Sequence, residues 1–332
     1  MGNDKQQERG SSRRSHDQPT AETPGDLAPA GNDNGDESDD LQSLSTPIVV
    51  GNKIEEFPPK PQHIRPYSPD TLCDGWSSDR MTVRMASVRG YRHRYKGVPR
   101  QDNADLGYDA RTGTVVFAVA DGVSSASYAH VGANAACRAA VDAILQDLAP
   151  EESVGPDWPR VIGAAANAVT QDAALILERP PTSQDEAESL VATTLVAGYL
   201  RPSDDGLSGS ILQIGDSSAW LHRNGRYDAI LPAKESDYLV SSSVFPLPRL
   251  PETIDPAYVY LDPDSILLVG TDGFGDPLGD GDGLIGQLFT NHLATPPSPV
   301  KFARLLDFSR ETFDDDRTLI AIWPRPHEQG KH

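Results

Sequence analysis

The hydrophobic pattern between residues 114 and 177 distinguishes one strand from two helices. Residues 114–120 (TVVFAVA) form a short, continuous apolar run rich in β-branched residues, which predicts a β-strand. Residues 128–148 and about 158–177 instead carry alanines and larger apolar residues at helical spacing. We therefore predict a strand followed by two long helices.

Short apolar runs bounded by Gly, Pro, Asp or Asn predict further strands. They lie at residues 191–200, 210–214, 219–222, 258–261, 265–269 and 318–323. The Arg-Asn-Gly sequence at 223–225 and the Asp-Pro-Asp sequence at 262–264 predict hairpin turns. Long helices between runs of hairpin-linked strands indicate an α+β fold in which helices cover antiparallel sheets.

The ends of the chain differ from this central part in composition. Residues 1–46 are mainly Gly, Asp, Ser, Pro and Gln, a composition that predicts a disordered acidic tail because it offers too little apolar surface to bury. A Pro-rich arm or linker is expected at 47–75. The folded domain is predicted at 76–325, beginning near Trp76, with a C-terminal tail at 326–332.

Charge and hydropathy exclude several classes of partner. The formal net charge of −20 repels phosphate backbones and anionic lipid surfaces, so we expect neither nucleic acid nor a membrane as a partner. No apolar run reaches the roughly 18 residues that a membrane helix needs, and the first residues are too polar for a secretory signal. The two cysteines, Cys73 and Cys137, support neither a disulfide framework nor a thiolate zinc site. We expect a cytoplasmic protein.

Five aspartates share one local setting in the sequence, at or beside the end of an apolar strand and mostly next to glycine. They are Asp102, Asp121, Asp216, Asp272 and Asp315. Carboxylates with little His or Cys nearby select hard cations such as Mg²⁺ or Mn²⁺. Two such ions a few ångströms apart can polarise a phosphoryl oxygen and activate a water, so that no side-chain nucleophile is needed.

Each of these positions also has a plainer interpretation. An Asp-Gly pair is a common turn signal, and the acidic run at 314–316 could be a solvated cluster of charges. The order and context of the segments together favour the metal site over the plain turns.

Six segments occur in the order found in one phosphatase family. They are residues 90–102 (GYRHRYKGVPRQD), 119–123 (VADGV), 192–195 (ATTL), 214–217 (IGDS), 271–274 (TDGF) and 315–318 (DDRT). In this order the chain resembles the PPM (PP2C-type) metal-dependent serine/threonine protein phosphatases, in particular a PP2C-like bacterial-type branch, over residues 85–325 or so.

The resemblance implies a four-layer αββα sandwich with a dinuclear Mn²⁺ or Mg²⁺ centre at one edge. By position, Asp121 would bridge both metals and the Gly122 carbonyl would bind one of them. Asp102, Asp272 and Asp315 would complete the second site, and Asp216 with Asp272 would hold a third ion weakly. The implied activity is hydrolysis of phosphoserine and phosphothreonine on proteins by a metal-activated water, opposing a serine/threonine kinase, and we expect a monomer.

One departure from the family pattern concerns how phosphate is held. The Arg that usually binds it would stand at position 97, where this chain has Gly97. The nearby candidates are His93, Lys96 and Arg100; we favour Arg100 as the phosphate ligand and His93 as the general acid. The alternative for the basic residues at 92, 94 and 96 is the solvated face of a strand.

Two further alternatives stay open at this stage. The chain could be a catalytically weak, PPM-like regulatory or binding module, although all the core aspartates are present. The Pro-rich stretch at 244–251 (VFPLPRLP) falls where family members carry a flap over the substrate, and it could equally be a structural loop.

Overall fold

Two antiparallel sheets form the centre of the molecule, in a computed structural model that describes residues 46–55, 57–150, 153–231 and 246–326. The first sheet has five strands in the order β10-β7-β6-β5-β4, and the second has six in the order β2-β3-β13-β11-β8-β9. A short parallel pair, β1 with β12, lies outside them. The expected acidic tail at 1–46 and the C-terminal tail at 326–332 lie outside the described residues, except for positions 46 and 326.

The strands run between the following bounds. They are β1 (Ile48–Val49), β2 (Thr71–Ser77), β3 (Met81–Val88), β4 (Asn103–Asp109), β5 (Thr114–Ala120), β6 (Leu195–Pro202), β7 (Leu207–Ile214), β8 (Ser218–Arg223), β9 (Arg226–Ala229), β10 (Ala257–Leu261), β11 (Ile266–Gly270), β12 (Phe308–Ser309) and β13 (Arg317–Pro324).

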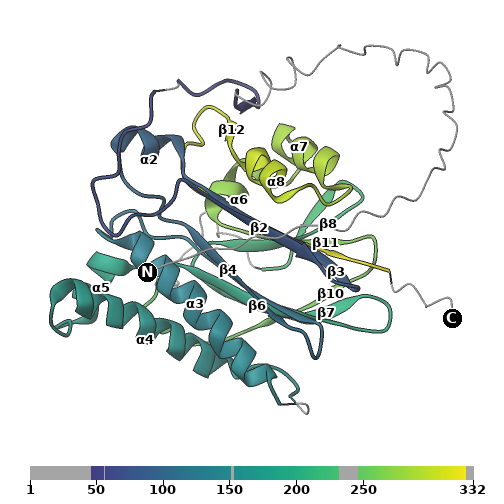
Figure 1. Cartoon of the computed structure of the whole chain (residues 1–332), viewed down its shortest axis with the longest axis horizontal. Coiled ribbons are helices and arrows are strands. Elements are labelled where there is room, and N and C mark those ends of the chain that lie inside the picture. The colour runs from purple at the N-terminus through teal and green to yellow at the C-terminus, as the bar shows by residue number, and fades with distance from the viewer. Residues whose placement is uncertain (1–45, 56, 151–152, 232–245, 327–332) are drawn as a thin grey trace, which may run out of the picture. The chain divides into compact units, whose positions relative to one another are not determined.

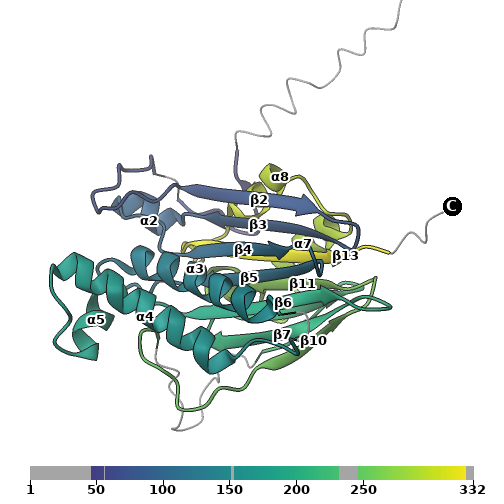
Figure 2. The same cartoon turned by 60° about the horizontal axis from the view of Figure 1, so that its bottom comes forward.

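The helices fall into a short helix near the sheet edge and two groups that cover the sheets. They are α2 (Tyr91–Lys96), then α3 (Ala129–Leu148), α4 (Trp158–Leu177) and α5 (Gln184–Val191), and finally α6 (Asp272–Leu278), α7 (Leu284–Leu293) and α8 (Pro299–Leu306). Figures 1 and 2 show α3 and α4 on the outer side of the five-stranded sheet and α6 to α8 on the outer side of the six-stranded sheet. The predicted αββα sandwich is confirmed.

Alternating side chains of β5 explain why its sequence is apolar throughout. Val116 and Ala118 pack with helices α3 and α4, whereas Val115, Phe117 and Val119 face the core between the two sheets. A strand covered on both faces needs no polar positions. The second sheet is covered in the same way, since β11 and β13 contribute to the inter-sheet core on one face and to a cluster with α6, α7 and α8 on the other.

The predicted strand and helix positions agree with the structure in most places, with two corrections. The expected strand at 191–200 begins only at Leu195, because Val191 is the last residue of α5, a helix that was not predicted. Its start was visible in the sequence: Ser183 Oγ accepts a hydrogen bond from the Glu186 amide at 3.1 Å, as an Ser-x-x-Glu helix start predicts.

The second correction concerns one of the two predicted hairpins. Asn224 and Gly225 have φ values of 51° and 79° and join β8 to β9, so the hairpin predicted at 223–225 is confirmed. The Asp-Pro-Asp sequence at 262–264 is a turn but not a hairpin, because it leads from β10 in one sheet to β11 in the other. A turn sequence fixes the local reversal and not the sheet that the chain enters next.

The segment at 47–75 takes part in regular structure. Strand β1 pairs with β12, and β2 begins at Thr71, before Trp76, and pairs with β3 along the edge of the six-stranded sheet. Between these strands, the described residues, 50–55 and 57–70, contain no helix or strand. Within the described part of the chain, no helix is long and apolar enough to cross a membrane.

Candidate metal centre

Asp121 stands directly after β5, where the start of the neighbouring strand holds its main chain. The amide of Asp121 donates to Thr194 Oγ1 at 2.9 Å, and its carbonyl accepts from the Thr194 amide at 2.8 Å. Thr193 Oγ1 donates to the same carbonyl at 2.9 Å. These three bonds occupy the backbone of Asp121 and leave its carboxylate to the site.

Asp216 follows β7 at a tight turn that requires glycine. Gly215 has a φ of +92°, and a Cβ there would lie 2.5 Å from Thr194 Cγ2. Behind the turn, the hydroxyls of Thr194 and Ser217 are 2.8 Å apart. Thr194 therefore contacts the strand ends that carry Asp121 and Asp216.

Asp272 is the first residue of α6, directly after β11. A Cβ at the next position, Gly273, would lie only 1.8 Å from the Asp316 carbonyl oxygen, so glycine permits the close approach of the two loops. The preceding residue, Thr271, donates from Oγ1 to Asp102 Oδ2 at 2.7 Å. This bond links the end of β11 to the start of β4.

The fold brings three of the predicted ligands into one group. Asp121, Asp216 and Asp272 each offer a carboxylate oxygen, and these atoms lie within 4.8 Å of one another. The residues are far apart in the sequence and meet because β5, β7 and β11 all end at the same edge of the sandwich. Three converging carboxylates are a donor set that suits a hard divalent cation.

The electrostatics of two buried carboxyl groups also fit a cation. Burial, together with repulsion from Asp316, Asp272 and Asp315, raises the pKa of Asp102 to about 8 despite the opposing Thr271 hydrogen bond. The pKa of Asp121 is raised well above its usual range by burial, by the charges of Asp102 and Asp272, and by a hydrogen bond with Asp102. Carboxylates that repel one another in this way are stabilised in their charged form by a bound cation.

Asp315 lies beside this group, at the start of β13, in contact with basic residues of α2. Arg92 Nη2 is 2.6 Å from Asp315 Oδ2, and His93 Nε2 is 3.7 Å from Asp315 Oδ1. Burial raises the pKa of Asp315, and the nearby His93 and Arg92 partly oppose the shift. Asp315 also contributes to the raised pKa values of Asp102 and Asp121, so it lies close enough to act on both.

The carboxylate of Asp316 is buried under the first motif. It accepts hydrogen bonds from the amides of Gly90 at 2.6 Å and Gln101 at 2.5 Å, and its Oδ2 is 2.8 Å from Nδ1 of His93. In the sequence, Asp316 appeared only as part of the acidic run at 314–316. Its buried position gave no local signal, since its partners Gly90, His93 and Gln101 are far away in the chain.

Arg100 and Gly122 were both predicted as site residues. The Arg100 guanidinium is 3% exposed and donates to the carbonyls of Asp102 at 3.0 Å and Ser87 at 3.2 Å. These bonds tie the loop before β4 to the end of β3, and phosphate binding by Arg100 stays a prediction. Gly122 packs against the first residue of α3, because a Cβ on it would lie 2.7 Å from Cβ of Ala129. Metal binding by its carbonyl is likewise a prediction.

The centre of the basic stretch at 89–100 is a helix and not a strand. Residues Tyr91–Lys96 form α2, which ends at Gly97 with a φ of +70°. Arg92 is therefore placed beside Asp315, a neighbourhood that sequence reasoning missed because a strand would have put residues 92, 94 and 96 together on one solvated face.

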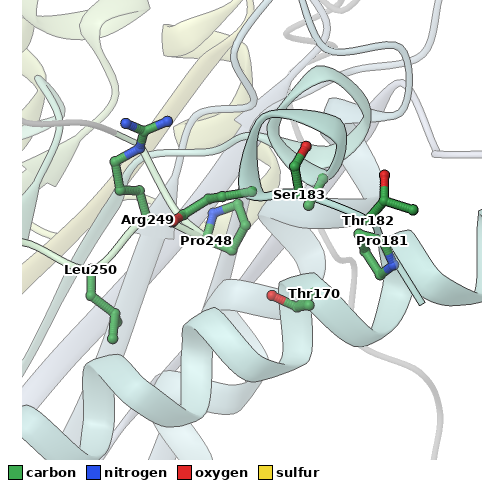
Figure 3. A pocket seen from close by; sticks show the side chains of 9 residues that line it. Thr170, Pro181, Thr182, Ser183, Pro248, Arg249 and Leu250 are labelled. Carbon is green, nitrogen blue, oxygen red and sulfur yellow. The ribbon is translucent and has the colours of Figure 1, made fainter.

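The proline-rich stretch at 244–251 is described from Pro246 onward. Leu247 exchanges backbone hydrogen bonds of 3.1 and 2.8 Å with Thr193, and Arg249 binds Glu188 of α5 at 2.7 Å. Figure 3 shows the nearby pocket, of about 580 Å³, between this segment, α4 and the start of α5. Its lining includes none of the predicted metal ligands.

A family model and several solved structures resemble this chain. The family model described as Protein phosphatase 2C matches residues 89–315. A search of curated proteins gives no significant match.

Among solved structures, the S. agalactiae serine/threonine phosphatase is 16% identical, with a TM-score of 0.50, and the match covers 74% of this chain and 100% of that one. RsbX in complex with magnesium is 16% identical with a TM-score of 0.49, covering 76% of this chain and 100% of that one. The catalytic domain of PstP with two manganese ions is 17% identical with a TM-score of 0.47, covering 74% and 99%. Since the family model covers more than half of the chain and every predicted strand-end aspartate, the chain belongs to the protein phosphatase 2C family.

Proposed function

We propose that this protein is a metal-dependent phosphatase that hydrolyses phosphoserine and phosphothreonine on proteins at a dinuclear Mn²⁺ or Mg²⁺ centre. The observation that carries the proposal is the convergence of Asp121, Asp216 and Asp272 within 4.8 Å. The raised pKa values of Asp102 and Asp121 support it, because a bound cation would offset the burial and the mutual repulsion that raise them.

The chain's own residues hold and orient the reacting groups in this proposal. Asp121 would be shared by two cations and the Gly122 carbonyl would bind one of them, while Asp102, Asp272 and Asp315 would complete the second site. Asp216 with Asp272 would hold a third ion more weakly. When bound, the cations would polarise the phosphoryl group and make a water nucleophilic at neutral pH.

Arg92 is the better-supported candidate for holding the substrate phosphate. Its guanidinium reaches Asp315 and its side chain is 36% exposed, so it can exchange a carboxylate partner for phosphate oxygens. His93 remains our candidate for the general acid, since it lies next to Asp315 and its pKa is raised by Asp316 although burial alone would lower it.

The competing function is a regulatory or binding module with the same fold and weak catalysis. The two differ in whether the acidic cluster turns over substrate, not in whether it binds cations. The purified protein should hydrolyse p-nitrophenyl phosphate and a phosphothreonine peptide when Mn²⁺ is added. This hydrolysis should cease when EDTA is added. Cation binding without turnover on any phosphopeptide would favour the regulatory module, and full turnover in EDTA would refute the metal-dependent mechanism.

A further inference from the structure

Two segments of this acidic protein contain basic residues and no acidic ones. Residues 57–69 and 89–100 carry no Asp or Glu, whereas the whole chain has a formal net charge of −20. A local surplus of positive charge in a strongly negative molecule directs an anionic partner to that place.

The structure joins these two segments into one surface. The Lys60 amide donates to the Arg94 carbonyl at 2.9 Å, and the His63 amide donates to the Gly97 carbonyl at 3.1 Å. The ammonium of Lys60 lies 4.0 Å from the ring centroid of Tyr95, which is 46% exposed. The arm before β2 therefore lies along the C-terminal end of α2.

Some of the basic side chains in these segments are already neutralised. Arg94 binds Asp307 at 2.9 Å, and the buried Arg89 binds Asp70 at 2.8 Å. Lys60 and Lys96 are exposed, and among the described residues neither makes an ion pair with a carboxylate. We define the α2 basic surface as Lys60, Arg92 and Lys96, with Tyr95 between them.

The spacing along α2 relates this surface to the metal centre. Arg92 contacts Asp315 at 2.6 Å, and Lys96, four residues later, lies on the same side of the helix one turn further away. Four residues of helix span about 6 Å. An extended peptide advances about 3.3 Å per residue, so this distance corresponds to about two peptide residues.

We propose that the α2 basic surface binds acidic residues that lie about two to four positions from the phosphorylated residue, and so selects acidic segments of phosphoprotein substrates. The inference rests on the proposed phosphatase activity and adds a substrate class to it. The two exposed lysines, with the partly buried Arg92 beside Asp315, suit one or two carboxylates of a peptide, whereas the net charge of the whole molecule opposes the long contact that a nucleic acid makes.

The first experiment compares turnover of two phosphothreonine peptides of equal length. One peptide carries Glu at the positions two, three and four residues before and after the phosphothreonine. The other carries Ala at the same positions. For the wild type we expect a kcat/KM about five- to tenfold higher with the Glu peptide, from one or two exposed charge pairs worth about two- to fivefold each. Lys60→Ala/Lys96→Ala should reduce that ratio to about two or less.

Two controls separate this effect from general damage. Lys301→Ala removes an exposed lysine from α8 that does not belong to the α2 basic surface, and it should leave the ratio unchanged. Hydrolysis of p-nitrophenyl phosphate should stay at the wild-type rate in the Lys60→Ala/Lys96→Ala variant. An equal loss on both peptides and on p-nitrophenyl phosphate would assign these lysines to the chemical step or to folding and would overturn the proposal.

Binding tests the surface independently of catalysis. In EDTA, fluorescence anisotropy should show tighter binding of the labelled Glu peptide than of the Ala peptide at low salt, and the difference should shrink in 0.5 M NaCl because exposed pairs are screened. Equal affinities of the wild type for both peptides would overturn the proposal. Preferential binding without turnover in Mn²⁺ would refute the proposed activity and leave the binding surface standing. If the protein instead bound phosphatidylserine vesicles in a lysine-dependent way and showed no preference between the peptides, the α2 basic surface would be a lipid-binding surface. That result would refute the proposed selection of acidic peptides.

Discussion

His93 and Asp316 form a buried pair in which Nδ1 of His93 lies 2.8 Å from Oδ2 of Asp316. Burial alone would lower the pKa of His93, but the charge of Asp316 raises it overall. Burial alone would raise the pKa of Asp316, but His93 and the amides of Gly90 and Gln101 lower it overall. The pair therefore joins α2 to the start of β13, and each group stabilises the charged form of the other.

Asp316→Asn should lower the free energy of unfolding by about 3 kcal/mol at pH 6, because an amide nitrogen would face buried hydrogen-bond donors. His93 has a raised pKa, so its contribution is present below its unfolded-state value and is lost as the pH rises through the folded value. The difference between wild type and variant should shrink in that range. Urea denaturation across pH 6 to 9, with Asp314→Asn as the control, measures both effects. A difference that grew with pH would contradict the charged pair.

Asp121→Asn and Asp272→Asn should each lower phosphatase turnover by orders of magnitude while leaving the fold intact. Each substitution removes a carboxylate from the group that we propose holds the cations, and neither side chain contributes to the apolar cores. Asp264→Asn, on the exposed turn between β10 and β11, is the matched control and should keep the wild-type rate. Wild-type rates in either cluster variant would remove that residue from the metal centre.

Arg92 and Arg100 should respond differently to substitution. Arg92→Ala should raise KM for a phosphopeptide about tenfold, because a charged hydrogen-bond donor to phosphate would be lost. Arg100→Ala should mainly lower the free energy of unfolding, by about 2 kcal/mol, since it removes the buried hydrogen bonds that Arg100 donates to the carbonyls of Ser87 and Asp102. Steady-state kinetics and urea denaturation of both variants distinguish the roles. A raised KM only in Arg100→Ala would restore the sequence prediction that it binds phosphate.

Stability in the absence of metal should fall as the pH rises from about 4 to about 8. The pKa of Asp102 is raised to about 8 by burial and neighbouring carboxylates, so the folded protein binds a proton over a range in which the unfolded chain does not. A divalent cation opposes this loss by stabilising the ionised cluster. The increase in Tm on adding Mg²⁺ should therefore be larger at pH 8 than at pH 5.5. Differential scanning fluorimetry in EDTA and in Mg²⁺ measures it, and an increase that does not depend on pH would contradict the shared burial of these carboxylates.

Local sequence was sufficient for the elements whose stability depends on their own pattern. The strand at 114–120 and the helix at 158–177 lie where the apolar spacing predicts them, since each buries a face that its own residues define. The five strand-end aspartates were recognisable for a similar reason: a carboxylate beside glycine at a strand end is a local feature, and the order of the six segments supplied the rest.

Tertiary structure alone decided how these parts meet. Residues far away in the chain decide which sheet follows the turn at 262–264. They also decide which acidic residue Arg92 of α2 contacts and which amides donate hydrogen bonds to the Asp316 carboxylate. The sequence predicted that aspartates would gather at one site, but the 4.8 Å spacing of Asp121, Asp216 and Asp272 depends on the register and stacking of two sheets. Burial, which sets the pKa values of these carboxyl groups, is a property of the whole packed sandwich, and no single segment of the sequence carries it.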